Sequence, residues 1–253
     1  MWLRGAAVPP HERCVAVVGS RAASPYGAAL AHRLAADLAG LGVAVVSGLA
    51  RGIDAAAHRG ALAGGGRTVA VVPSGLDHVT PAHHAALADE IAGSGTLLSE
   101  IATGAPFGRG AFVRRNRLIA ALAAVTVVVE AAERSGALTT ASWAQALGRP
   151  LFAVPGDVDR PTARGTLALL RGGAKPCGDA GDVLAALHAI AGPAAAAEPS
   201  ARMAAALDAA PRTLDDLAAR ARLEPPAALG ELLRLEWAGV ALARPGQRWT
   251  ARP

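Results

Sequence analysis

Residues 43–58 read Val-Ala-Val-Val-Ser-Gly-Leu-Ala-Arg-Gly-Ile-Asp-Ala-Ala-Ala-His, and the fold of the chain follows from this stretch. Its apolar start is typical of a buried strand, and an alanine-rich helix is expected to begin near Ile53. In an open parallel sheet, ligands bind where a strand ends and the next helix begins. The free N–H groups of that helix end and the guanidinium of Arg51 would favour an anion there. The alternative is a tight turn with a solvated Arg51. The candidate site residues of this turn are Ser47, Gly48, Arg51 and Gly52.

The same alternation of strand and helix continues on both sides of this stretch. Strands are expected at 15–18, 43–46, 68–72, 96–99, 125–129, 151–154 and 174–176. Helices are expected at 25–39, 53–63, 82–92, 113–123, 139–147, 166–171 and 182–191, with a long loop over 100–112. The strands are continuous apolar runs, which indicates a sheet that is buried on both faces. The pattern predicts an α/β domain over 1–191, with a doubly wound, mostly parallel sheet.

The composition changes after this domain. Residues 192–202 are rich in Ala and Pro and are expected to be a linker. In 203–253, helices are expected at 203–209, 213–222 and 226–238, followed by a hairpin of 240–242 with 248–250 around Pro245-Gly246. This order resembles a winged helix, a module that often binds duplex DNA. The unit has seven arginines and six acidic residues, so contact with a protein stays open as the alternative.

The net charge of +5 and the pI of about 10.4 indicate a polyanionic partner. Lys175 is the only lysine, so a base-composition bias toward arginine is the alternative explanation. No uncharged apolar stretch approaches the roughly 20 residues of a membrane span. Cys14 and Cys177 have neither metal-site spacing nor a disulfide framework, which favours a reducing cytoplasm. No metal or cofactor is expected.

Two further stretches are expected at the same sheet edge. Gly19-Ser20-Arg21 follows the first strand, without the spacing or the acidic residue of a nicotinamide-cofactor site. Residues 109–117 read Arg-Gly-Ala-Phe-Val-Arg-Arg-Asn-Arg and carry no acid. A base stacked on Phe112, with its phosphates on the arginines, is the pattern expected for single-stranded nucleic acid. The alternative is a core Phe112 beside a solvated basic face.

The arginines of this segment cannot all have one role. Arg114, Arg115 and Arg117 cannot share one face of a helix, so at least one is expected to make a structural contact. Asn116 is expected to hold a loop, and Glu100 and Glu130 are expected to order arginines.

No catalytic constellation is evident. Asp54 and His58 are spaced four residues apart on one helix, and such a spacing most often indicates an intrahelical hydrogen bond or a structural contact. Ser135-Gly136 and Thr139-Thr140 have no base beside them, and the P-loop motif is absent from the sequence.

Taken in order, these motifs resemble the DNA-processing family DprA, also called Smf. The matching segments are Val-Gly-Ser-Arg (18–21), Ser-Gly-Leu-Ala-Arg-Gly-Ile-Asp (47–54), His58, Leu-Ser-Glu (98–100), Arg-Asn-Arg-Leu-Ile-Ala (115–120), Ser-Gly-Ala-Leu-Thr-Thr (135–140) and Val-Pro-Gly (154–156). The resemblance implies an extended Rossmann-like domain that binds and protects single-stranded DNA, forms homodimers and loads RecA during natural transformation. It implies no enzymatic activity. It points to a DNA site at Ser20, Arg21, Gly48, Arg51, Arg115, Asn116, Arg117 and Lys175; the residue patterns above add Gly19, Ser47, Gly52, Phe112 and Arg114.

The chain departs from the family pattern in three places. The family's usual N-terminal helical domain is not evident, which implies a short form or a fragment. The loop at 77–84 lacks the usual Tyr-Pro, and Val113 replaces the usual Pro after Phe112. An enzyme is the alternative: nucleoside-monophosphate phosphoribohydrolases of the same superfamily carry Pro-Gly-Gly-x-Gly-Thr and then a catalytic Glu, where this chain has residues 135–140 and no Glu in the helix that follows.

Overall fold

The computed structural model describes residues 1–191, 199–237, 240–244 and 248–251. The chain divides into two compact units, Met1–Ile190 and Ala191–Pro253. The first unit contains an eight-stranded sheet of order β1-β5-β4-β3-β2-β6-β7-β8. Every neighbouring pair is parallel except β1 with β5. The strands are β1 (Trp2–Gly5), β2 (Cys14–Val18), β3 (Ala44–Ser47), β4 (Thr68–Val71), β5 (Thr96–Ser99), β6 (Val125–Val128), β7 (Leu151–Ala153) and β8 (Lys175–Pro176).

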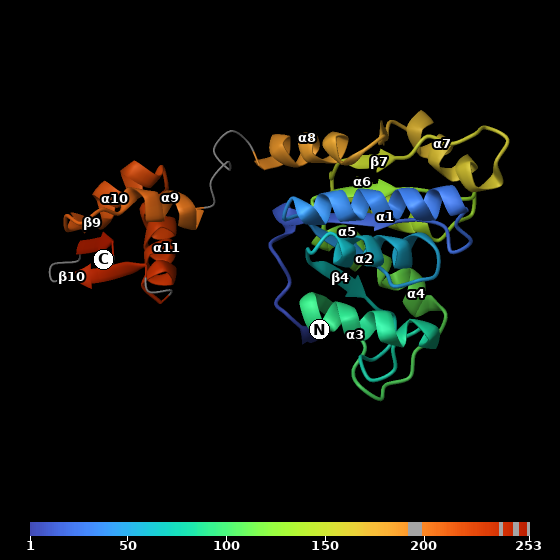
Figure 1. Ribbon diagram of the computed structural model, residues 1–253, viewed down its shortest axis with the longest axis horizontal. Coiled ribbons are helices and arrows are strands. Elements are labelled where there is room, and N and C mark those ends of the chain that lie inside the picture. Colours follow the sequence, from blue (N-terminus) through green and yellow to red (C-terminus); the bar gives the residue numbers. More distant parts are fainter. Residues whose placement is uncertain (192–198, 238–239, 245–247, 252–253) are drawn as a thin grey trace. The chain divides into compact units, whose positions relative to one another are not determined.

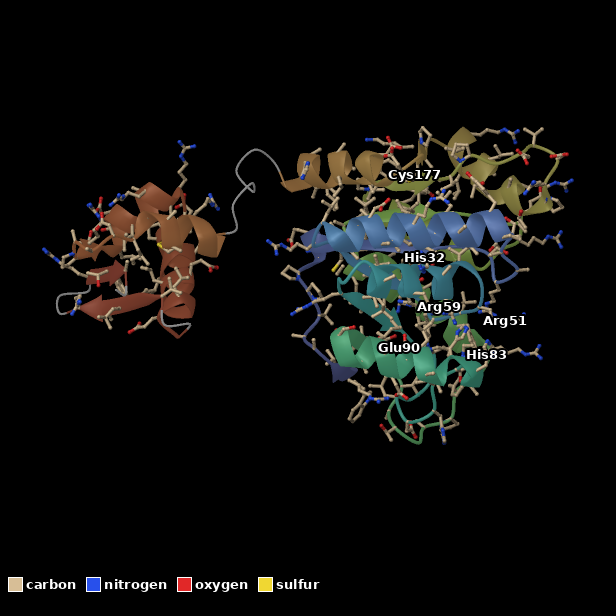
Figure 2. All side chains as sticks on the ribbon, viewed as in Figure 1. His32, Arg51, Arg59, His83, Glu90 and Cys177 are labelled. Atoms are coloured by element: carbon tan, nitrogen blue, oxygen red, sulfur yellow. The ribbon has the colours of Figure 1, made fainter. Side chains whose placement is uncertain are left out.

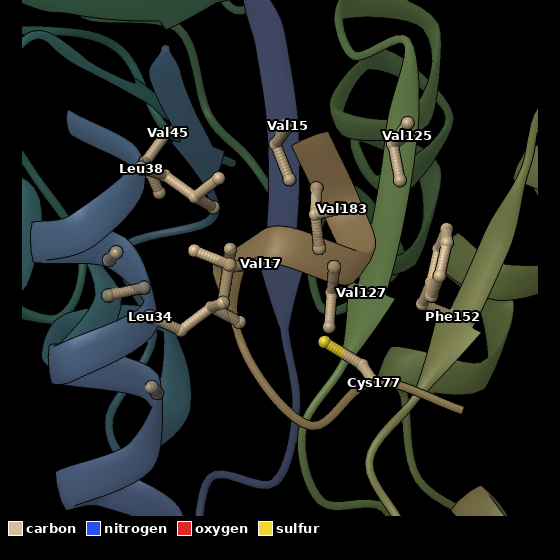
Figure 3. Packing of buried hydrophobic residues seen from close by; sticks show 14 of the residues in the cluster. Val15, Val17, Leu34, Leu38, Val45, Val125, Val127, Phe152, Cys177 and Val183 are labelled. Carbon is tan, nitrogen blue, oxygen red and sulfur yellow. The ribbon is translucent and has the colours of Figure 1, made fainter. Parts of the chain in front are cut away.

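Helices cover both faces of this sheet (Figure 1). The helices of the unit are α1 (Pro25–Gly40), α2 (Ile53–Ala63), α3 (Ala85–Ser94), α4 (Gly110–Arg114), α5 (Asn116–Leu122), α6 (Ala137–Ala146), α7 (Arg164–Arg171) and α8 (Ala180–Ala191). Val15 and Val17 of β2 face the core shared with α1 and α8, as Figure 3 shows. Ala16 and Val18 face the opposite core, shared with α5 and α6, because successive side chains of a strand point to opposite faces. The doubly wound, mostly parallel α/β fold is therefore confirmed.

Two elements of this unit differ from the expectation. The strand β1 is exposed throughout and pairs antiparallel with β5, placing Trp2 opposite Ser99. It has no buried face, so its sequence carries no hydrophobic periodicity. The expected helix 113–123 is two helices, α4 and α5, and α4 begins inside the expected loop. Ala111 is the only buried residue of α4, so its sequence gives no amphipathic signal.

The second unit has the element order of a winged helix. It contains α9 (Pro199–Ala206), β9 (Arg212–Thr213), α10 (Leu214–Ala221), α11 (Pro225–Trp237), β10 (Ala241–Arg244) and β11 (Arg248–Ala251). The expected hairpin is confirmed, with Leu242 opposite Thr250. The short strand β9 was not expected from the sequence, and α9 begins four residues earlier than the expected helix at 203. Residues 192–198 of the expected linker and the turn at Pro245-Gly246 lie outside the described residues.

In the described residues of either unit, no helix is long and apolar enough to cross a membrane.

Candidate functional site

A cavity of the first unit lies where the connections of the sheet change direction. From β2 the chain proceeds through β3, β4 and β5 on one side, whereas β6 pairs with the other side of β2. Open α/β sheets bind ligands at such a switch point, outside the carboxyl ends of the strands. A cavity of about 760 Å³ lies at this edge, and we call it the β2–β6 cavity. Its polar and aromatic lining residues include Ser20, Arg21, Asp54, Arg109, Phe112, Arg115, Asn116, Arg134, Ser135 and Thr140.

The two glycine-containing turns are joined directly, as their positions after β2 and β3 predict. The N–H of Ile53 donates to the carbonyl of Ser20 over 3.1 Å, and the N–H of Ser20 donates to the carbonyl of Glu130 over 2.7 Å. Gly52 has a φ of +78°, and a Cβ there would stand 2.2 Å from the Ser20 oxygen. Only glycine adopts this positive φ without strain and leaves room for the Ser20 carbonyl. Gly52 therefore allows the two turns to contact each other.

A buried ion pair lies under the second turn. The Nη1 of Arg115 donates to the carbonyl of Val71 over 2.6 Å, and its Nη2 lies 3.9 Å from Oδ2 of Asp54. Oδ2 of Asp54 also accepts from the N–H of Gly48. Burial lowers the pKa of Arg115 to about 10, and the nearby Asp54 opposes that shift. Burial raises the pKa of Asp54, and Arg115 opposes it. Arg115 thus makes the structural contact expected of one arginine in this segment.

The same turn is held at Leu49 by two histidines. The N–H of Leu49 donates to Nε2 of His58 over 3.3 Å, and Nδ1 of His84 donates to the Leu49 carbonyl over 2.8 Å. The hydroxyl of Thr68 donates to Val45, so Nδ1 of His58, 2.7 Å from Thr68 Oγ1, must carry the ring proton. Burial lowers the pKa of His58 to about 3. Both ring nitrogens of the neutral His58 therefore have hydrogen-bond partners, and the residue has a structural role. It holds Leu49, whose φ is +56°.

Three arginines line the cavity and are exposed: Arg21, Arg109 and Arg134. The guanidinium of Arg21 lies 5.0 Å from the ring centroid of Phe112. Phe112 is half-buried and lines the cavity, so it is not a core residue. The cavity therefore combines exposed positive charge with an accessible aromatic ring.

The remaining residues of 109–117 have distinct environments. The Nδ2 of Asn116 donates to the Gly136 carbonyl over 3.1 Å and to Oγ1 of Thr139 over 2.6 Å. It therefore holds the loop before α6, as expected. Arg117 pairs with Glu100, so Glu100 orders an arginine as expected. Arg114 is exposed. In the described structure, neither Arg114 nor Arg117 lines the cavity.

Other predicted site residues lie in or beyond the turns. Ser47 is buried, and its hydroxyl donates to the Val17 carbonyl over 2.7 Å. Arg51 is exposed at the turn before α2 (Figure 2). Lys175 is exposed on β8, and two strands separate β8 from β2. Lys175 is absent from the described lining of the cavity, and its Nζ lies 5.9 Å from the Phe152 ring centroid.

The expectation for Glu130 is wrong. Its carboxylate accepts from the N–H of Ser24 over 2.8 Å and from the Ser24 hydroxyl over 2.5 Å. It thus binds the N-terminal end of α1, and none of its described contacts is with an arginine.

Arg134 lines the cavity but was not expected from the sequence, whereas Arg109 belongs to the expected basic segment. Arg134 follows β6 and precedes α6, the same strand-to-helix position that indicated the first two turns. That positional rule is the signal that would have found it. The contact of His84 with Leu49 has no such signal, because it joins residues 35 positions apart. In the described residues, no cluster of three or more His, Cys, Asp or Glu side chains could hold a metal ion.

Residues 1–188 match the family described as DNA recombination-mediator protein A, and residues 188–247 match the DprA winged helix domain. The chain belongs to the DprA family. The DprA protein of Mycobacterium tuberculosis is 46% identical over 252 residues, which cover 94% of this chain and 64% of that relative. The DprA protein of Streptococcus pneumoniae is 42% identical over 171 residues, covering 68% of this chain and 60% of that relative. The chain therefore spans less than two thirds of the length of these DprA proteins.

Two solved DprA structures are similar to this chain. The X-ray structure of DprA from Streptococcus pneumoniae has a TM-score of 0.67 and 39% identity, covering 72% of this chain and 64% of that one. The Helicobacter pylori DprA structure has a TM-score of 0.66 and 32% identity, covering 73% of this chain and 85% of that one. The Helicobacter work describes a single-stranded DNA binding mode of that protein.

Proposed function

We propose that this DprA-family chain binds single-stranded DNA in the β2–β6 cavity. The observation that carries the proposal is the group of exposed arginines, Arg21, Arg109 and Arg134, around the half-buried ring of Phe112. Basic side chains that bind phosphates, beside an aromatic ring that stacks a base, are the combination that single-strand binding requires. The only acid among the described lining residues is Asp54, and it faces Arg115.

Unpaired DNA suits the cavity better than duplex for a physical reason. Stacking on Phe112 requires a base whose face is free, and in a duplex that face is covered by the neighbouring base pairs. The single-stranded DNA binding mode described for the Helicobacter pylori relative supports the same substrate.

Arg115 has a positioning role in this proposal. Arg115 is only 6% exposed, and its contacts hold the turn that presents Arg51. We assign the three lining arginines, Arg21, Arg109 and Arg134, to the phosphates and Phe112 to a base. We also assign Arg51 to a phosphate, because it is exposed and follows the lining residue Ala50. Contacts of DNA with Arg114, Arg117 and Lys175 stay predictions.

The decisive measurement is fluorescence anisotropy of labelled oligo-dT, titrated with salt, with duplex of equal length as competitor. We expect salt-sensitive binding that duplex fails to displace. Arg21→Ala should weaken binding and lower the salt slope by about one unit, because one phosphate contact is lost. Arg171→Ala is the matched control, since Arg171 is exposed in the last turn of α7. Equal preference for duplex, or identical behaviour of the two variants, would overturn the site.

At the level of the cell, we propose the role that membership in the family supports: a cytoplasmic homodimer that protects incoming single-stranded DNA and loads RecA during transformation and recombination. The test is RecA filament formation on DNA coated with a single-strand-binding protein, with and without this chain. Faster filament formation is expected with the wild type, and Arg21→Ala should reduce the gain. A rate that is unchanged by the wild type would contradict RecA loading.

The proposal assigns no enzymatic activity. Incubation with nucleoside monophosphates tests the enzyme alternative, because a phosphoribohydrolase releases the free base. Release that persists through stringent purification and is lost in Arg21→Ala would replace the DNA-binding proposal.

A further inference from the structure

A second cavity lies on the same edge of the sheet. Its volume is about 390 Å³, and residues that follow β6 and β7 line it together with the start of α1. Among the described residues, it shares no lining residue with the β2–β6 cavity. The residues that matter here are Tyr26, Val154, Pro155, Arg160 and Thr162.

The lining of the second cavity suits a nucleobase. Tyr26 lies in the first turn of α1 and is 57% exposed, the highest exposed fraction among the described Phe, Trp and Tyr residues. The exposed Pro155 adds aliphatic surface, and the half-buried Thr162 adds a hydroxyl; Val154 also lines the cavity but is largely buried. Aromatic and aliphatic surfaces with a few polar groups bind flat, partly polar rings, and a tyrosine ring stacks any base.

The second cavity also contains a cation, Arg160, that could bind the phosphate of a nucleotide whose base occupies the cavity. The Nε of Arg160 lies 2.8 Å from Oδ2 of Asp157, and the two side chains are 53% and 65% exposed. An ion pair this exposed contributes little, so Arg160 can exchange Asp157 for a phosphate at small cost. The other acid of the cavity, Glu130, is held by Ser24 at the start of α1.

The two cavities are close enough for one strand of DNA. Residues 18–22 line the first cavity and Tyr26 lines the second, so the connection before α1 forms the boundary between them. The strands β2 and β7 flank β6 in the sheet, which separates their ends by roughly 10 Å, or two inter-strand spacings. A strand of DNA that follows this edge reaches both cavities with nearby nucleotides.

We infer that the second cavity is a base-binding subsite for the DNA strand whose phosphates are bound in the β2–β6 cavity. Tyr26 stacks the base, and Arg160 binds its phosphate. This inference rests on the proposed function, and it predicts that the added affinity appears only when the oligonucleotide is long enough to reach Tyr26.

The test compares the Kd of a short oligo-dT, about four nucleotides, with that of a long one, about twelve. The proteins are the wild type, Tyr26→Ala, Tyr26→Phe and Arg160→Ala. Leu41→Ala is the control, because Leu41 is an exposed apolar residue at the other end of α1. Tyr26→Ala should weaken binding of the long oligonucleotide by about fivefold or more and leave the short one unchanged. Tyr26→Phe should bind both as the wild type does, and Arg160→Ala should affect only the long one.

Two results would overturn the inference. Equal weakening of both oligonucleotides by Tyr26→Ala would mean that the substitution disturbs the start of α1, and a lowered melting temperature relative to Leu41→Ala would accompany it. No weakening of either oligonucleotide would mean that the DNA does not reach the second cavity. A wild-type protein that binds neither oligonucleotide would instead contradict the proposed function itself.

Discussion

The guanidinium of Arg115 occupies the space that a side chain at residue 48 would need: a Cβ on Gly48 would stand 1.7 Å from Nη1 of Arg115. Arg115 is at the same time bound to the Val71 carbonyl and faces Asp54. A glycine in the turn after β3 and an arginine in the connection from α4 to α5 therefore depend on each other. The turn that presents Arg51 takes its shape from this pair.

Gly48→Ala should force Arg115 out of its buried position. Overpacking of this kind costs about 1–3 kcal/mol in the free energy of unfolding, and urea denaturation measures it. Gly93→Ala in α3 is the control, because a Cβ there meets open space and alanine favours a helix. A Gly48→Ala protein as stable as the wild type would show that Arg115 moves freely.

Arg115→Ala should mainly lower the stability of the protein, whereas Arg51→Ala should mainly weaken DNA binding. Removing Arg115 leaves Asp54 buried without its cation, and breaking a buried pair costs about 3–5 kcal/mol. Arg51 is exposed, so its removal should change stability by less than about 0.5 kcal/mol while it weakens DNA binding. Urea denaturation and anisotropy on the same preparations distinguish the two. Full stability of Arg115→Ala would contradict the positioning role.

Phe112→Ala should weaken single-stranded DNA binding by about 1–3 kcal/mol, because one base loses its stacking surface. The half-buried ring lies at the cavity wall, so the melting temperature should change little. Phe107→Ala is the comparison, since Phe107 is an exposed phenylalanine outside the described cavity lining. Equal Kd values for the two variants would remove Phe112 from the site.

Lys175→Ala should weaken DNA binding less than Arg21→Ala does. Arg21 lines the β2–β6 cavity, whereas Lys175 is on β8 at the far side of β6 and β7. The salt dependence of the Kd measures both effects, and Arg21→Ala should lower the slope by about one unit. A larger loss with Lys175→Ala would restore the lysine contact that the family resemblance implies.

Acidification should destabilise the protein through His58. Its pKa in the folded protein is about 3, below the ordinary value of 6.5. The neutral His58 contributes fully to the free energy of unfolding above pH 6.5. This contribution is lost as the pH falls toward 3, at up to about 1.4 kcal/mol for each pH unit. The pKa of His84 is also lowered, so His84 likewise destabilises the protein as the pH falls. The pKa of Asp54 is raised, so Asp54 has the opposite effect on stability.

The difference in the free energy of unfolding between wild type and His58→Gln, followed against pH, isolates the contribution of His58, because both proteins contain His84 and Asp54. We expect the variant to be less stable at neutral pH and to lose less stability between pH 7 and pH 4.5, as measured by urea denaturation at each pH. His188→Gln removes an exposed histidine and should keep the wild-type slope. Parallel curves for wild type and His58→Gln would contradict a neutral, buried His58.

The sequence by itself determined the parallel sheet and the edge of that sheet at which two glycine-containing turns meet. Apolar runs such as 125–129 predict strands buried on both faces, and parallel strands bring their carboxyl ends to one edge. The turns at 19–21 and 48–52 were therefore expected to meet, and the hydrogen bond from Ile53 to Ser20 joins them. These features depend on local pattern and on chain connectivity, which a sequence carries directly.

Only the tertiary structure decided which arginine of the segment 109–117 is buried and which is exposed. Helical spacing separates Arg114 from Arg115, but it does not reveal that Asp54, the Val71 carbonyl and the missing side chain of Gly48 make room for Arg115. The hydrogen bond from His84 to the Leu49 carbonyl and the pairing of β1 with β5 likewise join segments that are distant in the sequence. Such contacts depend on packing between elements, and the energy of burying a charge is set by partners that lie far away in the sequence.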